Sequence, residues 1–245
     1  MYPKSLFISF LFLGMIPLFA ELKYFPKDKE ELIALVTDEK IKLDEIDTSK
    51  ITDMSYLFCE ARDGTRARSY LPECRATDRK SYKGIEKWDT SHVETMEKMF
   101  WENERFNEPI GDWDVSNVKD INRMFAGATS FNQPLEKWDV RNVKNMGGMF
   151  IATPFNQPLE KWDVRNVKKM DAMFARATAF NQPLEKWDVS RVEDMHRMFA
   201  ETPFNQPLGK WDVSQVENMA YMFADAKSFN QDLSSWDVRN VKDMS

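Results

Sequence analysis

The sequence predicts an α/β solenoid, in which about eight coils, each with one strand and one short helix, stack with a parallel sheet on one face. Three observations lead to this prediction. Tryptophan recurs seven times at spacings of 24 or 25 residues, between positions 88 and 236. Within each repeat, apolar residues follow first the period of a strand and then that of a helix. The composition, with 42% hydrophobic and 30% charged residues, is that of a folded chain.

One repeat shows the expected order of elements. In the segment LEKWDVRNVKNMGGMFIATPF, Trp138 and Val140 are separated by one polar residue, as in a strand. Val143, Met146 and Met149 then recur every three residues, which is the spacing of a buried helix face. One such unit cannot bury its apolar residues alone, so the repeats are expected to stack on one another.

The repeats begin with a degenerate copy. It runs LDEIDTSKITDMSYLF, with Ile46 where the tryptophan belongs. The shortened repeats carry Pro154 or Pro203 in a turn, which suits a tighter corner. A period near 25 residues lies in the range of leucine-rich repeats, so the stack is expected to be leucine-rich-repeat-like and right-handed.

The first 20 residues are predicted to be a secretory signal peptide. Lys4 precedes an apolar run of about 14 residues, which ends at Ala20 before a polar stretch. This run is short for a membrane span, and an uncleaved N-terminal anchor is the alternative. We therefore expect a protein that is secreted, or that lies at a bacterial cell surface or in the periplasm, with no membrane span after signal cleavage.

The rest of the chain is predicted to contain two parts. Residues 21–42 form an N-terminal capping segment with a short helix, and residues 43–245 form the repeat solenoid, interrupted by an insertion at 59–82. The last repeat is truncated at residue 245, nine residues after its tryptophan. We therefore expect the sequence to be a fragment of a longer protein or a shifted reading frame.

The two cysteines of the chain, Cys59 and Cys74, lie in the insertion. In an oxidising compartment they could close a short loop and stabilise the fold by about 3 kcal/mol. A reactive or metal-binding pair is the alternative, but no histidine or further cysteine lies nearby. We therefore predict a structural disulfide between them.

The recurring apolar residues are predicted to be core. Thirteen of the 15 methionines lie on the apolar positions of the repeat, where Ile121 replaces methionine once. A copper site or a promiscuous binding surface is the alternative for a methionine stripe. The tryptophan column is expected to be a buried structural ladder, formed by Trp88, Trp113, Trp138, Trp162, Trp187, Trp211 and Trp236.

Two polar columns accompany the apolar ones. An aspartate follows each tryptophan, and an asparagine follows each phenylalanine at the corner. We expect them to be structural ladders, with a calcium-binding column as the alternative for the aspartates. They include Asp114, Asp139, Asp163, Asp188, Asp212, Asn132, Asn156, Asn181 and Asn205. Ser-x-x-Glu sequences such as Ser190 to Glu193 predict capping boxes at the starts of the expected helices. In repeats without this serine, the aspartate after the tryptophan is the expected cap.

The sequence also excludes several classes of function. A net charge of −6 without a basic cluster argues against nucleic-acid binding. The chain lacks a phosphate-binding glycine loop and a nucleophile elbow. His92 and His196 occupy positions that vary from repeat to repeat, so both are expected to be exposed and not catalytic. We therefore expect no enzyme activity, no cofactor and no metal.

The repeat MFAGATSFNQPLEKWDVRNVKNMGGMF resembles that of BspA-type leucine-rich-repeat surface proteins, a version also abundant in mycoplasma surface lipoproteins. The resemblance covers about residues 28–245. It implies an exported, surface-located protein that acts in adhesion or host contact and has no catalytic residues. Two departures are the absence of a lipobox cysteine and the presence of the insertion with Cys59 and Cys74.

The predicted function is that of a secreted or cell-surface, non-enzymatic repeat protein that binds a protein or another surface macromolecule, in the manner of an adhesin. A structural or self-associating envelope protein without a specific external ligand is the alternative. The predicted binding face is the charged sheet face, with Lys137, Lys161, Lys186, Lys210, Arg141 and Arg165.

Overall fold

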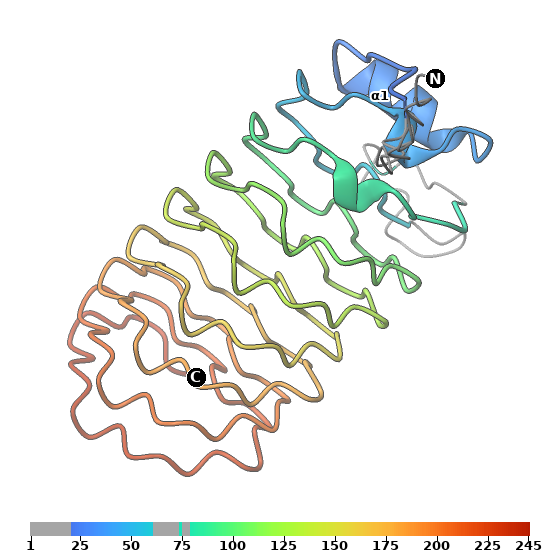
Figure 1. The fold of residues 1–245 in the computed structure, drawn as a ribbon. Coiled ribbons are helices and arrows are strands. Elements are labelled where there is room, and N and C mark those ends of the chain that lie inside the picture. The colour runs from blue at the N-terminus through green and yellow to red at the C-terminus, as the bar shows by residue number, and fades with distance from the viewer. Residues whose placement is uncertain (1–20, 61–73, 75–78) are drawn as a thin grey trace, which may run out of the picture.

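The computed structural model describes residues 21–60, 74 and 79–245 (Figure 1). The predicted signal peptide at 1–20 and most of the predicted insertion at 59–82 lie outside the described residues. Figure 1 shows a row of similar coils that lie side by side, from the helix near the N-terminus to the C-terminus. No helix in these ranges combines the length and the apolar character needed to cross a bilayer.

The N-terminal part packs against the first coil. Helix α1 (Lys29–Thr37) begins after Asp28, whose side chain accepts a hydrogen bond from the backbone N–H of Glu31. Its buried residues, Leu32 and Val36, belong to the same core as the coils. Two short 3₁₀ turns, η1 (Leu43–Glu45) and η2 (Ile85–Lys87), precede the first two repeats.

The predicted α/β solenoid with a parallel sheet is wrong. In the described part of the chain, the repeats contain no α-helix, and their only β-type pairing consists of isolated parallel bridges, such as the one between Asn145 and Lys169. The segment that has helical spacing is a succession of turns instead. The N–H of Met149, for example, donates to the carbonyl of Met146, three residues earlier. The repeats are therefore coils of turns and extended backbone.

Left-handed backbone at two positions of most repeats excludes a helix. Ala172, ten residues after its tryptophan, has a φ of 50°, and Arg176, fourteen residues after it, has a φ of 59°. Because these left-handed residues alternate with right-handed turns, every second backbone N–H points along the stack toward the next coil. These N–H groups therefore do not bond within their own segment, as they would in a helix. The donors at 170, 172, 174 and 176 bind the carbonyls at 194, 196, 198 and 200 of the next coil.

The aspartate after each tryptophan holds a turn, and the predicted capping boxes are also wrong. Asp188 accepts from the backbone N–H and from the hydroxyl of Ser190. Asp139 accepts in the same way from the backbone N–H and the guanidinium of Arg141. Serine and arginine can alternate at this position because both donate to the aspartate that shapes the turn. These hydrogen bonds lower the pKa of Asp139 and of Asp188.

The tryptophans of the column from Trp88 to Trp211 are buried, as predicted, whereas Trp236 in the last coil is half-buried; each is anchored to the coil before it. The Nε1–H of Trp162 donates to the carbonyl of Leu135 at 2.9 Å, and the Nε1–H of Trp187 donates to that of Leu159 at 3.0 Å. The ring of Trp162 is 3% exposed and lies parallel to the ring of Trp138, with centroids 6.3 Å apart. In the first coil Ile46 occupies this position and forms a bridge with Tyr24 instead.

The rest of the core consists of methionine and phenylalanine columns. Met146 and Met149 are fully buried, as predicted for the methionine stripe. Phe150 stacks on Phe155 of its own coil, with centroids 4.0 Å apart, and on Phe174 of the next coil at 5.7 Å. Near-parallel rings along the stack let each coil present the same apolar surface to its neighbour.

The asparagines form a hydrogen-bonded row along the corner. The side-chain oxygen of Asn132 accepts from the backbone N–H of Asn156, and the side-chain oxygen of Asn156 accepts from that of Asn181, both at 3.0 Å. Each side chain thus satisfies one backbone donor of the following coil.

Replacing Trp162 with phenylalanine tests the anchoring bond. The variant keeps a buried ring but removes one of the two donors to the Leu135 carbonyl, which still accepts from the backbone N–H of Trp138, and it leaves a small void. We expect the free energy of unfolding to fall by about 1–3 kcal/mol. Urea denaturation measures the loss. The control is Trp236→Phe, which removes the same kind of bond at a half-buried site and is expected to cost less. Equal losses in the free energy of unfolding at Trp162 and Trp236 would show that burial of the indole does not set the cost of removing its hydrogen bond.

Candidate binding surface

One face of the stack carries the residues that differ most between repeats. They lie nine, ten, thirteen and fourteen positions after each tryptophan, whereas the tryptophan, aspartate and phenylalanine columns hardly change. The backbone bonds between coils keep these segments side by side. We call this surface the variable face. In the repeats that begin at Trp138, Trp162, Trp187 and Trp211 it consists of Gly147, Gly148, Ile151, Ala152, Asp171, Ala172, Ala175, Arg176, His196, Arg197, Ala200, Glu201, Ala220, Tyr221, Ala224 and Asp225.

The variable face contains a groove of about 500 Å³. Ala175 and Ala200 form part of its floor and are nearly fully buried. Ile151 occupies the same position in an earlier coil. Alanine stands at this position in three successive coils, at 175, 200 and 224, and leaves room for the groove beside Ile151.

Charged side chains of both signs and two aromatic rings line the groove, and its acids are Asp171, Glu201 and Asp225. The guanidinium of Arg197 lies 5.2 Å from the centroid of the Tyr221 ring, in a cation–π contact. The ring of His196 meets the same tyrosine edge-on, with centroids 6.0 Å apart. Arg176 lies 3.8 Å from Glu201. Arg197 forms no ion pair with any of the described residues. An anionic group could therefore reach it without displacing a partner carboxylate.

Two glycines make room for side chains at one end of the groove. A Cβ atom at Gly147 would lie 2.5 Å from Oδ1 of Asp171, and one at Gly148 would lie 2.8 Å from Cγ of Arg123. Asp171 and Arg123 therefore lean toward the coil between them from opposite sides. Burial raises the pKa of Asp171, and the neighbouring charge of Asp194 adds to this effect. The charge of Arg123 and a backbone hydrogen bond act on this pKa in the opposite direction.

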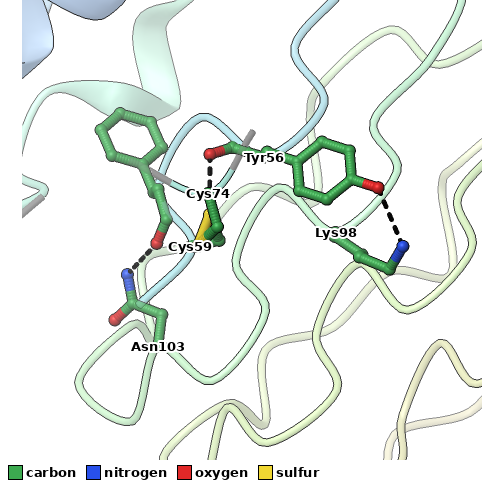
Figure 2. Close-up of a disulfide and its surroundings, with 6 residues drawn as sticks. Tyr56, Cys59, Cys74, Lys98 and Asn103 are labelled. Carbon is green, nitrogen blue, oxygen red and sulfur yellow. Dashed lines mark hydrogen bonds between the residues drawn. A yellow bond between two sulfur atoms is a disulfide. The ribbon is translucent and has the colours of Figure 1, made fainter. Parts of the chain in front are cut away.

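Bulky side chains and the disulfide occupy the corresponding positions near the N-terminus (Figure 2). Cys59 is bonded to Cys74, which confirms the predicted pair. Trp101 packs against this disulfide, and the hydroxyl of Tyr56 accepts from Nζ of Lys98 at 2.9 Å. The first two coils are thus packed where the later coils are open.

The residues of the predicted binding face lie outside the groove. Lys137 pairs with Asp112 of the preceding coil at 2.7 Å, and Lys161 pairs with Glu136 at 3.0 Å. Lys186 and Lys210 form the same kind of pair with Glu160 and Glu185. Arg141 and Arg165 bind the aspartates two residues before them, Asp139 and Asp163. These cations form an exposed row, but each already has an anionic partner.

Arg197, Tyr221 and Asp171 were not among the binding residues predicted from the sequence. These residues, like His196, stand at repeat positions where the residue type changes from one repeat to the next, and this variation is the sign of them in the sequence. His92 is exposed and lies near the hydroxyl of Ser91, at 3.1 Å, away from the groove. Among the described residues, no three histidine, cysteine or acidic side chains gather in a way that could hold a metal ion.

The fold and this surface define a repeat protein whose coils share one core and differ along one face. A sequence profile described as "Mycoplasma protein of unknown function, DUF285" matches residues 73–185 and 152–245. The chain belongs to this family. The match supports a mycoplasma-type repeat protein, but not membership of the BspA-type leucine-rich-repeat group. No curated protein and no solved structure matches the chain.

Removing the disulfide should destabilise the protein. Cys59 and Cys74 are 15 residues apart, and replacing both with serine is expected to lower the free energy of unfolding by about 2–4 kcal/mol, because the unfolded chain gains freedom. Urea denaturation with and without dithiothreitol measures this. The reductant should shift the wild-type midpoint and leave that of the double variant unchanged. An unchanged wild-type midpoint in reductant would contradict a stabilising role.

The raised pKa of Asp171 predicts a pH-dependent effect on stability. The pKa of Asp171 is higher in the folded than in the unfolded protein, so ionisation of its carboxyl group lowers the free energy of unfolding. This loss of stability disappears as the pH falls below the pKa of Asp171 in the unfolded chain. Asp171→Asn is therefore expected to be more stable than the wild type near pH 7, with the gain vanishing near pH 3. Thermal unfolding across this range measures the difference. A gain that persists at the acidic end would show that charge is not its cause.

Proposed function

We propose that this protein is a non-enzymatic surface protein that binds a protein or another surface macromolecule, in the manner of an adhesin, through its variable face. One observation carries the proposal: the residues that vary from coil to coil gather on a single face and line a groove. The family assignment and the apolar segment at 1–20 support a location at the cell surface.

The division between invariant and variable columns supports a binding role. The tryptophan, aspartate and asparagine side chains bond to their own stack, so their positions cannot change without loss of stability. The groove positions carry arginine, histidine, tyrosine, glutamate or alanine in neighbouring coils, although the backbone is the same. Such a scaffold can present a different chemical group at each coil, as extended repeat surfaces do when they bind partners.

Binding to intact cells tests the proposal. Fluorescently labelled protein is added to cultured animal cells, with unlabelled protein as competitor and with cells stripped by protease as a second arm. We expect saturable binding that falls at least about 10-fold, or 1.4 kcal/mol, when Arg197 is changed to glutamate. The matched control is Lys186→Glu, a charge reversal on the exposed row outside the groove, and it should bind as the wild type does.

Two outcomes would contradict this proposal. Loss of binding in Lys186→Glu and not in Arg197→Glu would move the site to the row of exposed lysines. Absence of saturable binding, together with concentration-dependent assembly in sedimentation, would favour a self-associating structural protein.

A further inference from the structure

We infer that the groove on the variable face binds an extended peptide segment with a bulky apolar side chain next to an acidic one. This inference rests on the proposed function and names the chemistry of the partner at the same site. It is carried by three features of the groove: an apolar slot, a guanidinium that forms no ion pair within the described ranges, and a half-buried acceptor.

The slot is the space that a larger side chain fills elsewhere in the stack. Thirteen residues after the tryptophan, the coils carry Trp101 and Ile151 in two repeats and alanine in four, at positions 126, 175, 200 and 224. Trp101 and Ile151 show that the fold accommodates large apolar side chains at this position. The buried methyl groups of the alanines leave a floor on which an apolar side chain from another chain can pack. The partner would supply what the chain itself supplies at Ile151.

The guanidinium of Arg197 sets the charge of the partner beside this slot. Its contact with the ring of Tyr221 holds it at the groove while leaving its N–H groups without a carboxylate from the described residues. Arg123 lies at the opposite end of the same groove, and it too forms no ion pair with the described residues. A planar guanidinium binds a carboxylate with two parallel hydrogen bonds, so acidic side chains complement both ends.

The acceptor and the aromatic contact favour a peptide over a glycan. The carboxylate of Asp171 lies half-buried at the groove and forms no ion pair with the described residues, so it can accept a backbone N–H of a bound segment. The Tyr221 ring would be the stacking platform for a sugar, but Arg197 already lies over it. The alanine methyl groups that form part of the floor suit an apolar side chain better than a hydroxylated ring.

Selection from a random peptide library tests the inference. A phage-displayed library of about 12-residue peptides is panned on the immobilised protein, after depletion on Ala200→Ile, in which the slot is filled as Ile151 fills it in its own coil. We expect enriched peptides to carry a leucine, isoleucine, phenylalanine or tryptophan within two positions of aspartate or glutamate. The affinity of one enriched synthetic peptide is then measured by fluorescence anisotropy.

Two groove variants and one control variant show which side chains of the groove bind the peptide. The dissociation constant should rise at least about 10-fold in Ala200→Ile and in Arg197→Glu, and should stay unchanged in Lys186→Glu. Matching urea midpoints show that each variant is folded. No enrichment, enrichment of basic peptides, or equal affinity for Ala200→Ile would each overturn the inference, as would binding to a glycan array in place of peptides.

The two proposals can fail separately. Cell binding that depends on Arg197, without any enriched peptide, would leave the proposed function standing and overturn the peptide chemistry. Enriched peptides that need Arg197 and the slot, without cell binding, would support the groove chemistry and contradict the surface function.

Discussion

The hydrogen bond from each tryptophan Nε1 to a carbonyl of the preceding coil is the interaction on which the stack depends. The ring packs between coils, so a buried donor and a buried acceptor must meet at every step, as they do between Trp162 and Leu135. A shift of one residue would leave the indole N–H without its acceptor, at a cost of about 1–3 kcal/mol; the Leu135 carbonyl would keep only the backbone N–H of Trp138. The register of all other columns follows from this bond.

Once the register is set, every second backbone donor in the methionine segment bonds to the next coil, and the others close turns within their own coil. The donors of residues 170, 172, 174 and 176 point toward the following coil, because left-handed residues such as Ala172 turn alternate peptide groups along the stack. The intervening side chains face outward, where packing places few demands on them. This explains why variation gathers at one face, and why His196 and Arg197 can stand where the preceding coil has Asp171 and Ala172.

The two charged surfaces of the molecule differ in how their cations are balanced. Along the exposed row, each lysine is paired with an acid of the coil before it, as Lys161 is with Glu136. Such surface pairs contribute about 0–1 kcal/mol each, but they neutralise that edge. In the groove, Arg197 is held by an aromatic ring and forms no ion pair with the described residues, so its charge remains available. The groove and the exposed row thus differ in whether their cations are paired with acids of the described residues.

The repeat period, the buried methionines and the cysteine pair were predictable because each follows from spacing or composition along the chain: Met146 and Met149 are buried whichever local structure carries them. The spacing of three residues between them occurs both in a helix and in consecutive turns, so the sequence pattern could not distinguish the two, and the choice of turns depends on hydrogen bonds to a neighbouring coil. The groove was likewise beyond the sequence pattern. It exists because Ala175, Ala200 and Ala224 come together across successive coils, and the space they leave is a property of several coils in contact.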